Sequence, residues 1–308
     1  MSVWPAESGG GSGSILLVED PADPAARPLL TVDRPVSSIT WSPDGQTLAY
    51  VTTLPGEQPW LRNDAVELIP VAGGEPTRWH VAEAAGIYLA GWWPDGQRIL
   101  YWPAPVHSVS LTADGMPLHS LPLGATEPIS LPTTHFNRHY LSWAPDGRTL
   151  LMVERGGRQL WDEKRLALCD VTTGNCRSLP RPEDKVSIDP AVSPDGKEIA
   201  LVRADRVADP ERTWSAEEMD EWVGSRTLWL VDSAGKSFRE ITVAGKGVYN
   251  PKWAKDGRHL VYIRDGALWV LDVETDQTTR VVTLSTTARH GYYGTIPWWN
   301  SMAWYQSD

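Results

Sequence analysis

The sequence predicts an all-β fold, a six-bladed β-propeller built from four-stranded antiparallel blades. Three observations predict it. One ten-residue phrase recurs five times along the 308 residues, a second pair of strands follows each copy, and each chain end carries half of a repeat. A repeated unit of about 50 residues made of short strands and turns is typical of propellers.

The recurring phrase begins Trp-Ser-Pro-Asp-Gly in its first copy and continues as an apolar run. Pro presets φ for a turn, Asp bonds the backbone two residues on, and Gly supplies a positive φ. Each copy therefore predicts a β-hairpin with a tight turn, and the aspartates are interpreted as turn formers rather than calcium ligands. They are Asp44, Asp95, Asp146, Asp195 and Asp256, at spacings of 51, 51, 49 and 61 residues.

A second hairpin is predicted after each copy, because turn residues again separate alternating runs. These hairpins span 66–79, 106–121, 165–179, 227–241 and 268–282. A degenerate sixth copy at 296–305 has no hairpin after it, and the N-terminal runs 15–20 and 27–32 have no phrase before them. We therefore expect the last blade to be closed by N-terminal and C-terminal strands together, which protects sheet edges.

Tryptophan recurs at one position of the innermost strands, and the chain has 17 Trp against 2 Phe. The opposite face of these strands carries mostly small residues, and large rings facing small residues suit close packing between neighbouring sheets. We assign the repeated rings to the core between blades rather than to a ligand site. They are Trp41, Trp92, Trp143, Trp253 and Trp298.

The chain divides into a tail and one propeller. Residues 1–14 are rich in Gly and Ser and predict a flexible tail, and 15–308 predict the propeller. The tail lacks the basic start and apolar stretch of a secretory signal, so we interpret it as a linker behind an anchor or signal that this sequence does not contain, or as a disordered cytosolic tail. No apolar run is long enough for a transmembrane helix. The net charge of −11 argues against nucleic acid as a partner.

The repeated Trp-Ser-Pro-Asp-Gly phrase resembles the repeat of the TolB-like β-propellers, over residues 15–308. The resemblance implies the propeller fold, whereas function varies among proteins with such repeats. TolB carries an α/β domain ahead of its propeller, and residues 1–14 are only a short tail. The prolyl-oligopeptidase-like peptidases carry a hydrolase domain with a Gly-x-Ser-x-Gly elbow after theirs, and this sequence ends within its predicted last blade.

Cys169 and Cys176 are the only cysteines, and they flank the turn of one predicted outer hairpin. If the turn is centred between Thr172 and Thr173, the two residues lie directly opposite each other, at a separation that a cross-strand disulfide spans. A disulfide places the protein outside the cytosol, in the periplasm or at the cell surface. The alternative is two reduced thiols, and the spacing is a poor match to a zinc site.

An insertion at about 205–225 predicts a short helix, because Ser215 and Glu218 form a capping box. Two interpretations stay open. The helix is a lid packed onto the propeller, or its large side chains form a partner-docking site, since Trp is enriched at binding hot spots. The predicted partner-binding residues are Trp60, Trp214, Met219 and Trp222.

The loops that lead into the innermost strands meet at the mouth of the central channel in a propeller. Tyrosines and amides there suit a peptide or glycan. The predicted residues of the channel mouth are Tyr88, His139, Tyr140, Asp189, Tyr249, Asn250 and Tyr293. The seven histidines are interpreted as single surface or channel residues, and no metal ligand set, cofactor motif or catalytic constellation is recognisable from spacing.

Three functions follow as hypotheses. The first is a non-catalytic binding or scaffold module that mediates protein–protein interaction, as a subunit or accessory protein of an extracytoplasmic or membrane-associated complex. The alternative is a metal-assisted lyase or hydrolase acting at the channel mouth through His139 and Asp189. The third is a structural subunit of an envelope complex, attached through the tail and a Trp-rich surface.

Overall fold

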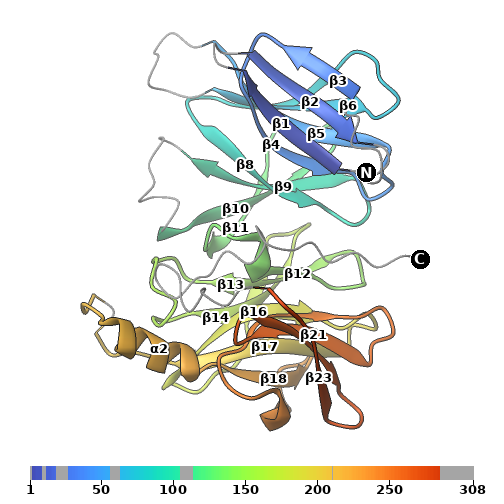
Figure 1. Ribbon diagram of the computed structural model, residues 1–308. Coiled ribbons are helices and arrows are strands. Elements are labelled where there is room, and N and C mark those ends of the chain that lie inside the picture. Colours follow the sequence, from blue (N-terminus) through green and yellow to red (C-terminus); the bar gives the residue numbers. More distant parts are fainter. Residues whose placement is uncertain are drawn as a thin grey trace. The chain divides into compact units, whose positions relative to one another are not determined.

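The computed structural model describes residues 2–8, 12–18, 27–55, 63–104, 114–209 and 211–284 (Figure 1). These residues form twenty-three β-strands, one α-helix and two short 3-10 helices, so the fold is all-β as predicted. The chain divides into two compact units. Unit 1 comprises residues 1–112 and 116–131, and unit 2 comprises residues 113–115 and 132–308.

Unit 1 holds a three-stranded sheet and two sets of four antiparallel strands. The three-stranded sheet contains β1 (Ser2–Ser8), β2 (Ser12–Val18) and β3 (Arg27–Val32). The first set contains β4 (Val36–Trp41), β5 (Thr47–Thr53), β6 (Asp64–Pro70) and β7 (Thr77–Ala82). The second set contains β8 (Gly86–Trp92), β9 (Arg98–Ala104), β10 (Met116–Pro122) and β11 (Ile129–Thr134), and the last residues of β11 belong to unit 2.

Unit 2 holds three further sets of four strands. The first contains β12 (Leu141–Trp143), preceded by the 3-10 helix η1 (Arg138–Tyr140), then β13 (Thr149–Glu154), β14 (Arg165–Asp170) and β15 (Cys176–Ser178). The second contains β16 (Lys185–Val192), β17 (Glu198–Asp205), β18 (Thr227–Asp232) and β19 (Phe238–Glu240). The third follows η2 (Thr242–Ala244) and contains β20 (Tyr249–Trp253), β21 (His259–Arg264), β22 (Ala267–Asp272) and β23 (Gln277–Thr283).

Each of the five copies of the repeated phrase opens one four-stranded set, at the turn that the sequence predicts. The Asp44 carboxylate accepts a hydrogen bond from the Gln46 N–H at 3.0 Å, and the other four aspartates bond the backbone two residues on in the same way. The five turn glycines have φ between +62° and +72°, the left-handed region that side chains disfavour. The turn chemistry of the phrase is thereby confirmed.

The repeated tryptophans lie where neighbouring blades meet. Trp92 of β8 donates its indole N–H to the Thr40 carbonyl of β4 at 3.3 Å, and Trp253 of β20 donates to the Ala191 carbonyl of β16 at 3.1 Å. Both rings are buried. One tryptophan therefore fills the space between two sheets and ties them through a backbone acceptor. Trp298 lies outside the described residues.

The N-terminus differs from the predicted flexible tail. Strand β1 pairs with β2 from Ser2 opposite Val18 to Ser8 opposite Ser12, so β2 has β1 on one side and β3 on the other. Backbone hydrogen bonds pair these strands although Gly is depleted in strands, and the prediction of a tail rested on the Gly and Ser content. The predicted closing strand at 296–305 lies outside the described residues, so closure of the last blade and the count of six stay predictions.

Candidate functional site

The innermost strands β16 and β20 of unit 2 each carry a bulge near their start. The register shifts between Ile188 and Ala191 in β16, and between Tyr249 and Lys252 in β20. Within these bulges, Asp189 has φ +50° and Asn250 has φ +46°. Asp and Asn tolerate this conformation better than other side chains, and a bulge turns a side chain away from the regular alternation.

The bulges connect neighbouring blades. The Asn250 N–H donates to the Asp189 carboxylate at 3.1 Å. Unit 1 uses the same device, because Ser38, with φ +47° at a bulge in β4, accepts a hydrogen bond at its hydroxyl from the Leu89 N–H of β8 at 3.0 Å. These polar side chains of the inner strands therefore form hydrogen bonds between neighbouring blades, and a ligand would meet groups that already have partners.

Charged groups gather around Asp189. Arg226, which directly precedes β18, is buried, and its guanidinium carbon lies 4.1 Å from the ring centroid of Tyr249 and 4.8 Å from that of Trp222. Burial raises the pKa of Asp189, against the opposing effects of Arg226, the Asn250 N–H and Lys252. Burial lowers the pKa of Lys252, which Asp189 opposes. The carboxylate is thus held between two cations.

His139 of η1 belongs to the same group. Its backbone N–H is fixed by the Asn137 side chain at 3.0 Å. Burial, and then the positive charges of Lys252 and Arg138, lower the pKa of His139 to about 4, so its imidazole is neutral at pH 7. We call Arg138, His139, Asp189, Arg226, Tyr249 and Lys252 the inner-strand cluster.

The inner-strand cluster is positive within an acidic protein. It holds three cations, Arg138, Arg226 and Lys252, and one carboxylate, Asp189, and the carboxylate of Asp220 on the neighbouring helix acts on Tyr249. Three positive against two negative charges contrast with the net −11 of the whole chain. Partly desolvated cations attract oxyanions more strongly than solvated ones do, so this arrangement suits a ligand that carries a carboxylate or phosphate.

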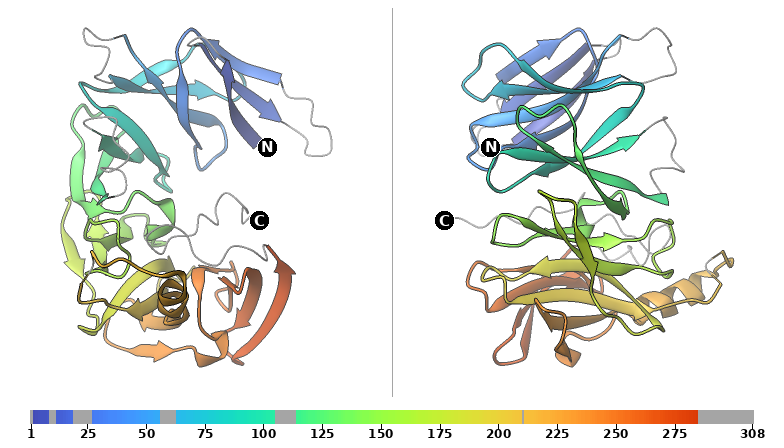
Figure 2. Two further views of the ribbon diagram at one scale, coloured as in Figure 1. Left: turned by 60° about the vertical axis from the view of Figure 1, so that its left-hand side comes forward. Right: turned by 180° about the vertical axis from the view of Figure 1, so that it is seen from behind.

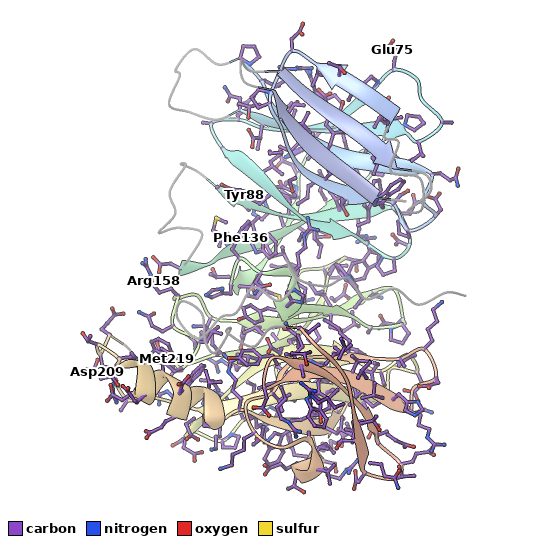
Figure 3. All side chains as sticks on the ribbon, viewed as in Figure 1. Glu75, Tyr88, Phe136, Arg158, Asp209 and Met219 are labelled. Atoms are coloured by element: carbon purple, nitrogen blue, oxygen red, sulfur yellow. A yellow bond between two sulfur atoms is a disulfide. The ribbon has the colours of Figure 1, made fainter. Side chains whose placement is uncertain are left out.

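The structure brings four of the predicted channel-mouth residues together, namely His139, Asp189, Tyr249 and Asn250. Tyr140 is buried and packs its ring against His135. Tyr88 belongs to β8 of unit 1 (Figure 3). Tyr293 and the predicted partner-binding residue Trp60 lie outside the described residues.

Sequence analysis missed the cations of the inner-strand cluster. Lys252 is the one charged residue at a strand position that otherwise carries Thr40, Gly91, Ser142 and Ala191. That irregularity was the available signal for Lys252. Arg226 and Arg138 stand beside predicted elements, and no local pattern marks Arg226 as a residue near Asp189 or Arg138 as one near His139.

The insertion forms helix α2 (Ala216–Gly224) with the predicted capping box, in which Ser215 and Glu218 exchange hydrogen bonds at 3.2 and 2.8 Å. The helix lies against β17 (Figure 2). Met219, labelled in Figure 3, is 7% exposed and Trp222 is 4% exposed. A partner cannot reach either side chain, which corrects their assignment to a docking surface.

The physical reason is that α2 buries its apolar face. Trp222 packs edge-on against Trp161 with the ring centroids 5.6 Å apart, and donates its indole N–H to the Asp205 carbonyl at 2.8 Å. Trp214 is half-buried, with its ring 4.8 Å from that of Trp161 and the Arg212 guanidinium 4.6 Å from its centroid. The insertion therefore has the arrangement of a lid packed on unit 2.

Cys169 of β14 and Cys176 of β15 lie directly opposite each other in the register. Their Cα atoms are 4.1 Å apart and a disulfide joins their sulfur atoms. The hairpin turn between them is held by Asp170, whose carboxylate accepts from the Thr172 N–H at 2.8 Å.

Among the described residues, no three His, Cys, Asp or Glu side chains come together as a metal-binding group. No helix among those residues is long and apolar enough to cross a membrane.

No model of a known protein family matches the sequence, and no curated protein does. Solved structures do match. An oligogalacturonate lyase in complex with manganese is 15% identical, with 92% of this chain and 73% of that chain covered and a TM-score of 0.58. A puromycin-hydrolyzing peptidase from Mycobacterium tuberculosis is 15% identical, with 94% and 46% covered and a TM-score of 0.58.

The putative TolB from Agrobacterium tumefaciens is 18% identical, with 83% of each chain covered and a TM-score of 0.46. At these identities the matches concern the fold alone. The chain has a β-propeller fold, as the two matches with TM-scores of 0.58 indicate. It spans less than half of the peptidase, so the activity of that whole protein does not carry over.

Proposed function

We propose that this chain is a non-catalytic propeller module that binds a protein partner, as a subunit or accessory protein of an extracytoplasmic or membrane-associated complex. The observation that carries the proposal is the inner-strand cluster. Arg226, which is 1% exposed, supports the cluster from within through its ring contacts with Tyr249 and Trp222. The half-buried Lys252 and the exposed Arg138 are the cations that a partner can reach, on a rigid strand framework. The excess of positive charge in the cluster fits an acidic segment of the partner.

The surroundings of Asp189 favour binding over catalysis. A general base needs a carboxylate that is free to take a proton from a substrate. Here the carboxylate accepts from the Asn250 N–H between blades and experiences the charges of Arg226 and Lys252, so it is already engaged within the protein, although burial raises its pKa. A carboxylate whose charge and hydrogen-bonding capacity already stabilise contacts between blades suits ligand recognition better than proton transfer.

The Cys169–Cys176 disulfide supports an extracytoplasmic location, because reducing compartments do not maintain such bonds. The same compartment holds envelope and membrane-associated complexes. The positively charged binding site would therefore meet its partner in an oxidising compartment.

The competing function is a metal-assisted lyase or hydrolase acting through His139 and Asp189. One feature favours it: a neutral imidazole and a buried carboxylate both face Lys252. Elemental analysis of the purified protein, combined with an Asp189→Asn variant, separates the two functions. The enzyme requires stoichiometric metal that Asp189→Asn loses.

The binding function is tested by charge removal at Lys252. Lys252→Gln removes the charge and keeps an unbranched polar side chain, and Lys236→Gln makes the same change in an exposed turn of unit 2. We expect wild type and Lys236→Gln to capture the same protein from the envelope fraction of the source, and Lys252→Gln to capture at least about tenfold less, the loss of one charge-assisted contact. Equal capture by both variants contradicts the role of the inner-strand cluster.

A further inference from the structure

Three ring side chains meet in unit 1, away from the inner strands. His80 comes from β7, Tyr101 from β9 and His119 from β10. The Tyr101 hydroxyl oxygen lies 3.2 Å from Nε2 of His80 and 3.3 Å from Nδ1 of His119. Tyr101 is 2% exposed, and the two histidines are half-buried. We call these three residues the ring trio.

The hydrogen bonds of the ring trio are satisfied when all three rings are neutral. A phenol has one proton, so it donates to one imidazole and accepts from the N–H of the other. Neutral imidazoles are the form that binds metal ions.

The two nitrogen–oxygen separations of the ring trio match the separation of neighbouring ligand atoms around a metal ion. Around zinc, bonds of about 2.0–2.1 Å in a tetrahedral arrangement place neighbouring ligand atoms about 3.3 Å apart. The two nitrogen–oxygen separations in the ring trio are 3.2 and 3.3 Å. An ion bound beside the phenol oxygen would therefore need little movement of the rings.

A negative charge lies nearby. The exposed Glu127, in the segment between β10 and β11, acts electrostatically on both His80 and Tyr101. A carboxylate of this kind favours a cation at the ring trio through its charge, without being one of its ligands. Glu127 acts electrostatically on His80 and Tyr101, and His80 acts electrostatically on His119.

We infer that the ring trio is a binding site for a divalent transition-metal ion of the zinc or copper type, with His80 Nε2, His119 Nδ1 and the Tyr101 oxygen as ligands and Glu127 as the outer carboxylate. Two imidazoles and a phenolate suit these ions better than magnesium or calcium. On binding, the ion takes the place of the phenol proton, which leaves to water as H⁺, and no electron is transferred. The phenol is an essential third ligand, since His80 and His119 are the only two histidines that meet here among the residues that the structure describes.

The test uses the full chain after treatment with a chelator, titrated with Zn²⁺ by calorimetry. We expect one ion per chain, and affinity at least tenfold weaker in Tyr101→Phe and in His119→Ala. Cu²⁺ should give the visible charge-transfer absorption of a copper–phenolate bond in wild type and not in Tyr101→Phe. Tyr262→Phe, a change at a buried tyrosine in unit 2, is the matched control and should bind both ions as wild type does.

Circular dichroism and thermal unfolding verify that each variant folds. Tyr101→Phe keeps the ring in place, so its result stays interpretable if His119→Ala does not fold. Absence of stoichiometric Zn²⁺ binding by wild type overturns the inference. Zn²⁺ binding of equal affinity by folded Tyr101→Phe overturns it as well, because the ion would then bind elsewhere.

Discussion

The inner-strand cluster of unit 2 and the ring trio of unit 1 both bring polar side chains together from separate strands, but they are stabilised differently. In the cluster, full charges face each other across bulges, and Arg226 and Asp189 are 1% and 4% exposed. In the trio, neutral rings share one phenol proton. A charged group that loses a partner leaves an uncompensated buried charge, whereas a neutral group loses only a hydrogen bond. The cluster should therefore be the region that tolerates substitution least.

The largest loss of unfolding free energy is expected when Arg226 is replaced. Arg226→Met removes the cation between Trp222, Tyr249 and Asp189 and leaves the carboxylate with Lys252 as its remaining facing cation. Breaking a buried charge pair on one side costs about 3–5 kcal/mol of unfolding free energy. Tyr101→Phe in the trio should cost only about 1 kcal/mol. Denaturant unfolding measures both, and equal losses would mean that the two regions are not differently stabilised.

How much of each region could be predicted from sequence follows the same division. The turn aspartates, the capping box of Ser215 and the opposed Cys169 and Cys176 are set by residues close together in the chain, and the structure has all three features. Asp189 and Asn250 could be predicted because every blade begins its inner strand at the same point of the repeat.

The remaining features depend on contacts between strands far apart in sequence. Arg226 faces Asp189 only because α2 packs Trp222 onto unit 2. His80 and His119 each look like single surface histidines, and they meet only because β7 lies beside the next blade. The strand β1 was missed for another reason, since its pairing with β2 forms in spite of the Gly and Ser content that suggested a tail.

The disulfide lies within unit 2, so its removal tests whether the two units are stabilised independently. Replacing Cys169 and Cys176 together by Ser opens a covalent loop with a sequence separation of 7 residues. The loop-closure model for a loop of this size gives a loss of about 2–3 kcal/mol. Thermal unfolding of the double variant measures that loss. Zn²⁺ binding at the ring trio of unit 1 should be unchanged, and a change would show that the two units are coupled.

The smallest effect concerns protonation of His139 in the inner-strand cluster. Its pKa is lowered to about 4 by burial, Lys252 and Arg138, against about 6.5 for an unfolded histidine. The unfolded chain therefore takes up a proton first as the pH falls, so the contribution of His139 to stability is complete above about pH 6.5 and is lost progressively toward pH 4. With partial exposure the loss should be about 1–2 kcal/mol. Denaturant unfolding at pH 7 and pH 4.5 should show a smaller decrease in the unfolding free energy of His139→Gln than in that of wild type. If wild type and His139→Gln decrease equally, the imidazole is not held neutral by its two cationic neighbours.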